Sequence, residues 1–169
     1  MSGAEIRPAG PCDVALLAEL YQQAFAAGGD EAFAGTPWSA RSLAEVMALP
    51  GVFGLLAVAA GAPAGFLLAQ VLFEEAELLT LGVLPARRRA GLARRLLAEG
   101  LAEARRRGAR RMTLEVAADN VGAQALYREF GFLEAGRRRN YYRKADGGGL
   151  DALLLVRPLE VPEAPVTAS

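Results

Sequence analysis

The chain of 169 residues contains no histidine and a single cysteine, Cys12. The lack of histidine excludes Cys/His zinc fingers and every catalytic mechanism that needs an imidazole. One cysteine cannot form an intramolecular disulfide. Because Cys12 lies far along the chain from the residues with recognisable chemistry, we interpret it as structural.

The chain also lacks an excess of positive charge. Its 19 basic residues, of which Lys144 is the only lysine, balance 19 acidic ones, whereas dedicated nucleic-acid binders are basic. No apolar run reaches the roughly 18 residues of a membrane span, and residues 1–7 lack an apolar signal core. We therefore expect a cytoplasmic protein with no membrane partner and no direct nucleic-acid partner.

Hydrophobic residues make up 53% of the chain, which is enough for one globular core. We expect a single domain over residues 1–158 and a flexible tail over 159–169, where prolines recur. The periodicity predicts an α/β (α+β) fold, a mixed sheet of about seven strands with helices on both faces, in the order β-α-α-β-β-β-α-β-α-β-β. The predicted strands are 5–8, 52–60, 64–73, 77–83, 111–117, 132–142 and 150–156, and the main helices are 13–27, 89–107 and 120–130.

A basic loop joins the strand that ends at Val83 to the following long helix, with the spacing Arg88-x-x-Gly91-x-Ala93. The unpaired N–H groups and the positive dipole end of a helix N-terminus bind phosphate well. Gly91 and Ala93 keep the first turn free of bulky side chains. The loop therefore indicates a pyrophosphate site, with a merely solvated basic helix start as the alternative. It is not a nucleotide P-loop, because Gly-Lys-Ser/Thr is missing.

Glu115 is the only charged residue within the apolar strand segment 112–117. A carboxylate is costly there unless something pairs with it or uses it, and a carboxylate in such a place suits a general base. The alternatives are a solvent-facing glutamate and a partner of a nearby arginine.

The next helix begins at Asn120, a favourable N-cap residue. Asn120, Gln124 and Tyr127 share one helical face, at spacings of four and three residues. A phenol on that face can reach beyond the end of the preceding strand, or it can simply fill the core.

Two of these segments resemble the signatures of the GNAT superfamily of N-acetyltransferases. Arg88-x-x-Gly91-x-Ala93 is similar to its coenzyme A pyrophosphate loop, and Asn-x-x-Ala-x-x-Leu-Tyr-x-x-x-Gly-Phe over residues 120–132 is similar to its second signature. The likeness spans roughly residues 6–158. It implies acetyl-CoA as co-substrate, no metal, Asn120 against the pantetheine arm and Tyr127 as general acid. The cofactor-binding residues it implies are Leu81, Gly82, Val83, Arg88, Arg89, Ala90, Gly91, Leu92, Ala93, Arg94 and Asn120.

Within the superfamily, the chain resembles the bacterial ribosomal-protein-alanine N-acetyltransferases. The segments that carry this likeness are 37–39, 75–78, 114–116, 138–142 and 151–152. The resemblance implies that Glu115 is the general base and that the acceptor is the N-terminal α-amine, on alanine, of a small-subunit ribosomal protein. We also expect a monomer or weak dimer. We expect Trp38, Tyr141 and Tyr142 either to form an aromatic slot for the peptide N-terminus or to be core aromatics.

One segment departs from that branch. An acidic or histidine-containing turn usually precedes its Asp-Ala pair, whereas this chain has Gly147-Gly148-Gly149. A different turn leaves other acceptors open, namely a lysine ε-amine, a polyamine or an amino-sugar antibiotic. A non-catalytic acyl-CoA sensor is the alternative from another functional class.

Overall fold

The protein folds around one mixed sheet of seven strands in the order β1-β2-β3-β4-β5-β7-β6. The computed structural model describes residues 3–26, 38–144 and 146–160. The predicted fold class and element order are confirmed, and each strand matches its predicted range to within a few residues. The strands are β1 (Glu5–Ala9), β2 (Val52–Ala59), β3 (Ala62–Leu72), β4 (Glu75–Val83), β5 (Arg111–Ala117), β6 (Leu133–Arg143) and β7 (Gly149–Pro158).

The helices begin and end where capping residues permit. They are α1 (Val14–Ala26), α2 (Ala40–Met47), α3 (Leu92–Arg106) and α4 (Val121–Glu129), with short 3₁₀ turns at η1 (Pro11–Asp13) and η2 (Pro85–Arg87). Helix α3 starts three residues later than predicted. Arg89 and Gly91 both have positive φ, 64° and 77°, so the backbone before Leu92 cannot be helical.

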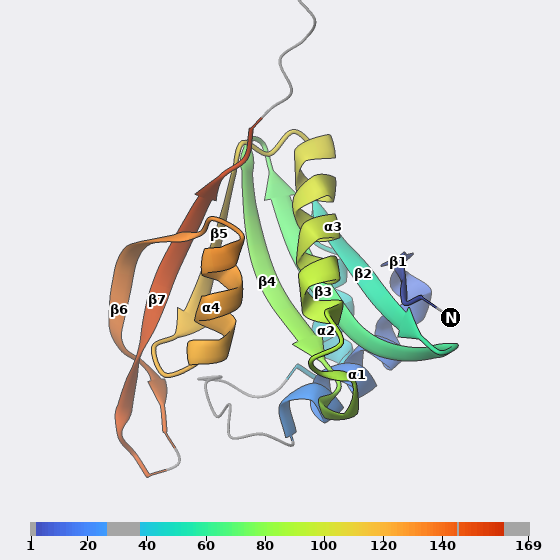
Figure 1. Cartoon of the computed structure of the whole chain (residues 1–169), viewed down its shortest axis with the longest axis horizontal. Coiled ribbons are helices and arrows are strands. Elements are labelled where there is room, and N and C mark those ends of the chain that lie inside the picture. The colour runs from blue at the N-terminus through green and yellow to red at the C-terminus, as the bar shows by residue number, and fades with distance from the viewer. Residues whose placement is uncertain (1–2, 27–37, 145, 161–169) are drawn as a thin grey trace, which may run out of the picture.

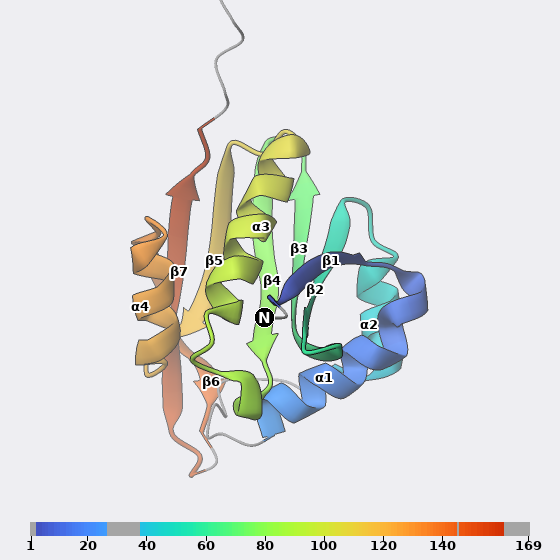
Figure 2. The same ribbon diagram turned by 45° about the vertical axis from the view of Figure 1, so that its right-hand side comes forward.

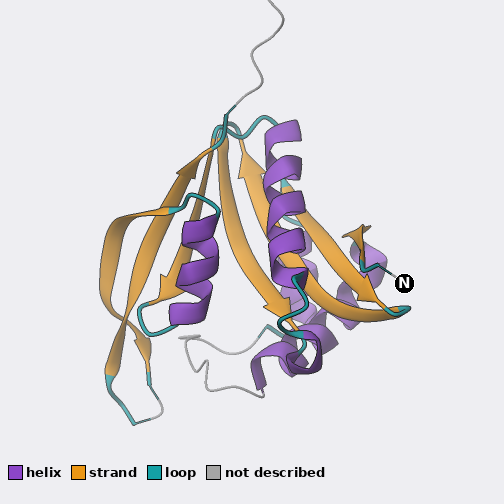
Figure 3. Ribbon diagram, viewed as in Figure 1, coloured by secondary structure: helices purple, strands orange, loops and turns teal. Residues whose placement is uncertain are grey.

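The helices cover the two faces of the sheet unequally (Figures 1 and 3). Helices α3 and α4 lie on one face, where their apolar residues share a core with β2 to β5 and β7. Helices α1 and α2 pack on the other face, against β2 and β3. On that second face the other half of the sheet has a small separate cluster, Ala117, Tyr142, Leu150 and Ala152, which includes no described residue of α1 or α2.

Strands β4 and β5 separate part-way along their length. They pair in parallel only from Glu75↔Arg111 to Glu77↔Thr113, although β4 continues to Val83 and β5 to Ala117. Figure 1 shows the two strands diverging towards their ends. A β-bulge at Leu79 accompanies the separation, because Leu68 pairs with Thr80 while Ala69 pairs with Leu78. The backbone of β4 beyond Glu77 therefore forms no ladder with β5.

The predicted boundary at residue 158 coincides with the end of β7. The residue after it, Leu159, is nevertheless buried, and its N–H donates to the carbonyl of Arg110 at 2.7 Å. The rest of the predicted tail, from residue 161, lies outside the described residues. None of the described helices is long and apolar enough to cross a membrane.

Candidate active site

A cavity of about 690 Å³ opens between the N-terminus of α3, helix α4 and the separated end of β4. It is lined by every residue predicted to hold coenzyme A except Ala90. These residues are Leu81, Gly82, Val83, Arg88, Arg89, Gly91, Leu92, Ala93, Arg94 and Asn120. Phe25, Tyr127 and Glu129 also line it.

The head of the cavity is the N-terminus of α3. Gly91 is the N-cap and has no side chain to bond the first-turn N–H groups. The first hydrogen bond of the helix runs from Arg95 N to Gly91 O at 3.1 Å, so the N–H groups of Leu92, Ala93 and Arg94 have no partner within the helix. No atom lies within 4 Å of the position where a Cβ of Gly91 would be. These donors and this open space fit a pyrophosphate.

The guanidinium of Arg88 is engaged with the backbone. Its Nη2 donates to the carbonyl of Ala24 at 2.7 Å and its Nε to that of Val83 at 3.2 Å. Arg88 thereby joins the loop before α3 to the last turn of α1, and Figure 2 shows these two segments side by side. These carbonyl partners are neutral, so Arg88 keeps its positive charge, and Arg87 and Arg89 beside it add to the positive charge that lines the cavity.

Arg94 and Glu129 form a bridge between α3 and α4 along the cavity wall. The guanidinium contacts both carboxylate oxygens of Glu129, at 2.8 to 3.0 Å. Both side chains are more than half exposed, so the pair contributes little to stability. It does, however, hold the two helices that enclose the cavity.

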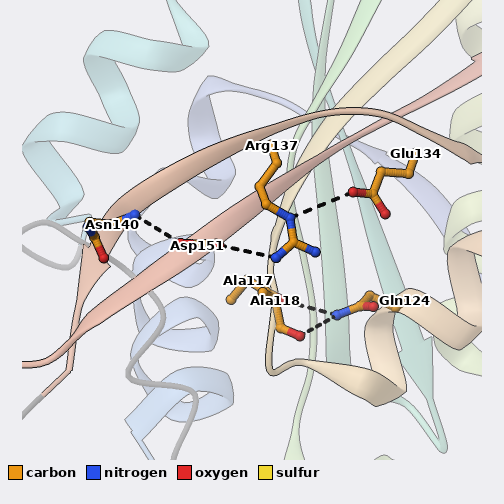
Figure 4. Close-up of polar contacts among 7 residues, drawn as sticks. All are labelled: Ala117, Ala118, Gln124, Glu134, Arg137, Asn140 and Asp151. Carbon is orange, nitrogen blue, oxygen red and sulfur yellow. Dashed lines mark hydrogen bonds and ion pairs between the residues drawn. The ribbon is translucent and has the colours of Figure 1, made fainter.

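Helix α4 is fastened to the end of β5 by two amide side chains. Asn120 is confirmed as the N-cap, because its Oδ1 accepts from Ala123 N at 3.1 Å. Gln124 is buried, and its Nε2 donates to the carbonyls of Ala117 at 3.1 Å and Ala118 at 3.0 Å (Figure 4). These bonds set the height of α4, and hence of Tyr127, relative to the strand end.

Tyr127 is 8% exposed and packs edge-on against Phe132, with 5.8 Å between ring centroids. Burial raises the pKa of its hydroxyl to about 12. Among the described residues the hydroxyl forms no hydrogen bond, and the side chain lines the cavity. The phenol is therefore protonated at neutral pH and free to donate.

Glu115 lies on the opposite face of the sheet from Tyr127. Its neighbours Leu114 and Val116 belong to the core that contains Tyr127, and successive side chains of a strand alternate between faces. The Glu115 side chain is 25% exposed, and its Oε1 pairs with Arg138 Nε at 3.1 Å. The predicted base is thus also the partner of an arginine. Glu115 is not among the residues that line the cavity, which reaches the separated end of β4 at Leu81, Gly82 and Val83.

Arg138 lies on this second face through its pairing with Ala152, and a bulge that follows it in the edge strand β6 places Tyr141 against it. The register of β6 on β7 shifts between Arg138 and Tyr142, and Asn140 has a φ of 53°. Asp151 holds the bulge, because its carboxylate accepts from Asn140 N at 3.0 Å and from Arg137 Nη1 at 3.1 Å (Figure 4). The Asn140 bond and then the Arg137 bond lower the pKa of Asp151.

The three aromatic residues predicted to form an acceptor slot belong to two different clusters. Trp38 stacks on Tyr21, with 5.7 Å between centroids, beside α1. Tyr141 and Tyr142 contact each other at 5.0 Å. Tyr142 is buried, and this burial together with the charge of Glu115 raises its pKa to about 12, whereas Tyr141 is 43% exposed. No described ring contact joins Trp38 to either tyrosine.

Comparison with known proteins decides the family. The acetyltransferase (GNAT) family pattern matches residues 16–132. The chain belongs to the acetyltransferase (GNAT) family. It is 42% identical over 101 residues, 60% of this chain and 68% of the relative, to a protein of Escherichia coli K12 named [ribosomal protein bS18]-alanine N-acetyltransferase.

Solved structures agree with this membership. The crystal structure of the ribosomal-protein-S18-alanine N-acetyltransferase from Escherichia coli superposes with a TM-score of 0.83 and 31% identity, covering 99% of both chains. A Salmonella typhimurium structure described as yncA with its cofactor acetyl-CoA has a TM-score of 0.80 and 25% identity, over 99% of this chain and 100% of that one. The protein is an N-acetyltransferase.

Two positioning residues of this GNAT enzyme escape detection from the sequence. Gln124 shares a helical face with Asn120 and Tyr127, but nothing in that spacing says that its amide bonds the end of β5. Asp151 belongs to segment 151–152, which resembles the ribosomal-protein-alanine N-acetyltransferases, but the sequence predicts no role for its side chain. Its role depends on the bulge of β6, which has no local sequence signal beyond Asn140, a residue type that tolerates positive φ.

Proposed function

We propose that this acetyltransferase transfers the acetyl group of acetyl-CoA directly to the α-amine of an N-terminal alanine on a small-subunit ribosomal protein in the cytoplasm. The observation that carries the proposal is the separation of β4 from β5 after Glu77, with the cavity against the separated end of β4 and Glu115 on the other face of β5. An acceptor amine on the Glu115 face can meet a thioester that enters from the cavity. The names of the bacterial relatives support the choice of acceptor.

Different residues of the cavity would bind different parts of acetyl-CoA. The first-turn N–H groups of α3 and the side chains of Arg87 and Arg89 would hold the pyrophosphate. Asn120 lines the same cavity further along, where the pantetheine arm would pass. A backbone N–H group of segment 81–83 on the edge of β4 that forms no ladder with β5 would polarise the thioester carbonyl, as an oxyanion hole does.

The transfer needs no covalent acyl-enzyme. The acceptor nitrogen attacks the thioester carbon, the new C–N bond replaces the C–S bond, and the nitrogen loses a proton to Glu115, directly or through water. Cys12 takes no part, because it is exposed in η1 at the start of α1.

Tyr127 would stabilise the departing sulfur. Its pKa of about 12 lies well above the value of about 8.5 for an ordinary thiol. A phenol with this pKa keeps its proton at neutral pH, so it can donate a hydrogen bond to the thiolate as the C–S bond breaks.

The acceptor's own acidity favours an α-amine. A peptide α-amine has a pKa of about 7.7–8.0, so roughly a third of it is neutral at about pH 7.5. Neutralising a lysine ε-amine at the same pH costs about 4 kcal/mol. A single carboxylate that is already paired with an arginine suffices for the first acceptor more readily than for the second.

The direct test uses acetyl-CoA and two peptides. One carries the alanine-initiated N-terminus of the host's small-subunit ribosomal protein, and the other has a blocked N-terminus and an internal lysine. Mass spectrometry should find acetylation on the α-amine of the first peptide alone. Acetylation of lysine, or of neither peptide while coenzyme A still binds, would contradict the proposed acceptor.

The residue roles are tested with Glu115→Gln and Tyr127→Phe. General base catalysis typically contributes about 10²–10⁴-fold, so Glu115→Gln should lower kcat/KM on the alanine peptide by at least the lower figure. Tyr127→Phe should lower kcat and leave acetyl-CoA affinity unchanged. Glu99→Gln, on the exposed side of α3, and Tyr21→Phe, in the cluster on the other face of the sheet, are the matched controls. Unchanged kcat in Tyr127→Phe would refute the assigned role.

A further inference from the structure

Arg138 reaches Glu115 diagonally across the intervening strand β7. On the sheet, Arg138 pairs with Ala152 and Ala152 with Ala117, whereas Glu115 pairs with Leu154. Ala152 is a fully buried small residue, so the arginine side chain can pass over it. The resulting ion pair, 3.1 Å from Nε to Oε1, joins a carboxylate that is 25% exposed to a guanidinium that is 59% exposed.

The plane of this guanidinium is fixed by a second contact. Its central carbon lies 4.8 Å from the centre of the Tyr141 ring, a cation–π contact. Tyr141 in turn is carried by the bulge that Asp151 holds. A guanidinium set between a carboxylate and an aromatic ring presents its remaining N–H donors in one direction. In the described part of the chain, these Nη donors form no hydrogen bond.

The donors lie beside the carboxylate that would receive the acceptor amine. In a peptide N-terminus, the α-amine and the first carbonyl are attached to the same carbon atom, so the carbonyl oxygen stays close to the nitrogen. A lysine ε-amine, a polyamine and a simple alkylamine have no carbonyl in that position. A hydrogen-bond donor fixed next to Glu115 therefore distinguishes these acceptor classes.

We propose that Arg138 is a specificity-determining residue that donates an Nη–H hydrogen bond to the carbonyl oxygen of the acceptor's first residue, while its Nε stays paired with Glu115. The inference rests on the proposed α-amine acceptor and adds the group that recognises it. A residue that only balanced the charge of Glu115 would affect every amine equally. Recognition of the carbonyl affects only acceptors that contain it.

The test compares wild type, Arg138→Gln and Arg138→Lys, with Arg139→Gln as the control, since Arg139 is exposed and has no ion pair among the described residues. Steady-state kinetics on the alanine peptide are combined with competitive inhibition by alaninamide and by 2-aminopropane, which has the same skeleton without the carboxamide. Loss of one charged hydrogen bond should lower peptide kcat/KM about ten- to a hundredfold, chiefly through KM. Arg138→Gln should raise the inhibition constant of alaninamide by about the same factor as it lowers peptide kcat/KM. The inhibition constant of 2-aminopropane should stay within about twofold of the wild-type value.

Arg138→Lys should recover part of the loss, because a lysine keeps the charge and a donor but not the fixed plane. Arg139→Gln should resemble wild type. If Arg138→Gln weakened both inhibitors equally, or weakened neither, the role of Arg138 would be overturned. Acetylation of the α-amine by the wild-type enzyme would still uphold the proposed function in that case. If wild type did not acetylate the alanine peptide, the proposed acceptor and this inference would both fall. Thermal melting of each variant confirms that it is folded.

Discussion

The guanidinium of Arg88 donates a 2.7 Å hydrogen bond to the carbonyl of Ala24, across 64 positions of sequence. The loop that opens the coenzyme A cavity is thus tied to the last turn of α1 on the other side of the sheet. The arginine of a cofactor signature consequently serves, through its side chain, to hold two elements together, and this leads to the first prediction.

Arg88→Ala should lower the free energy of unfolding by about 1–2 kcal/mol, because two hydrogen bonds from a charged donor are lost at a partly exposed site. Thermal melting measures the effect. Arg89→Ala removes a neighbouring charge without such bonds and should leave the melting temperature unchanged while weakening coenzyme A binding. If instead the two variants lost coenzyme A affinity equally and Arg88→Ala kept the wild-type melting temperature, Arg88 would be a phosphate ligand only.

Asp151→Ala should loosen the bulge of β6 and so disturb Arg138 and Tyr141. We expect KM for the alanine peptide to rise about three- to tenfold, with unchanged coenzyme A affinity. The lowered pKa of Asp151 means that its contribution is present above its unfolded value near 3.9 and is lost only as pH falls through the lower folded value. The effect on KM should therefore be constant between about pH 5 and 9. Asp146→Ala, in the neighbouring turn, is the control. If this variant raised the KM for the alanine peptide as much as Asp151→Ala does, the bulge would not be the cause of the effect.

Gly149→Ala tests the altered glycine turn. A Cβ at Gly149 would overlap the side chain of Asn140, so we expect a loss of about 1–3 kcal/mol in the free energy of unfolding. In the same hairpin, a Cβ at Gly136 would meet Leu154 at an ordinary 3.6 Å, and Gly136→Ala should be nearly neutral. Equal stability of the two variants in chemical denaturation would mean that Asn140 moves aside without cost.

Tyr127→Phe should change the alkaline stability of the protein. Because burial raises the pKa of Tyr127 to about 12 from an unfolded value near 10, its stabilising contribution is complete below pH 10 and is lost as pH rises through 12. The linked loss is about 2 kcal/mol by pH 12. Between pH 9 and 12, the free energy of unfolding should fall less steeply with pH in the variant than in wild type. Identical slopes would mean that the hydroxyl is solvated in the folded protein.

Much of the fold follows from short-range signals in the sequence. Alternation in segment 111–117 predicted both the strand and the separation of Glu115 from its apolar neighbours. The N-cap at Asn120 was likewise readable, because capping depends on a few adjacent residues, whereas the start of α3 was predicted three residues too early. The residues that the GNAT resemblance implied for coenzyme A fall in two continuous motifs beside helix starts, and all but Ala90 line the same cavity.

What the sequence could not determine depends on strand order and register. Placing β7 between β5 and β6 brings Arg138 to Glu115, and the bulge at Asn140 places Tyr141 against Arg138. The separation of β4 and β5 after Glu77 and the hydrogen bond from Arg88 to Ala24 are also long-range features. No local sequence pattern predicts either of them. The sequence by itself determined which residues could do chemistry, because residue type and spacing are local. Only the tertiary structure decided which of them meet, because partners across a sheet are chosen by the packing of the whole chain.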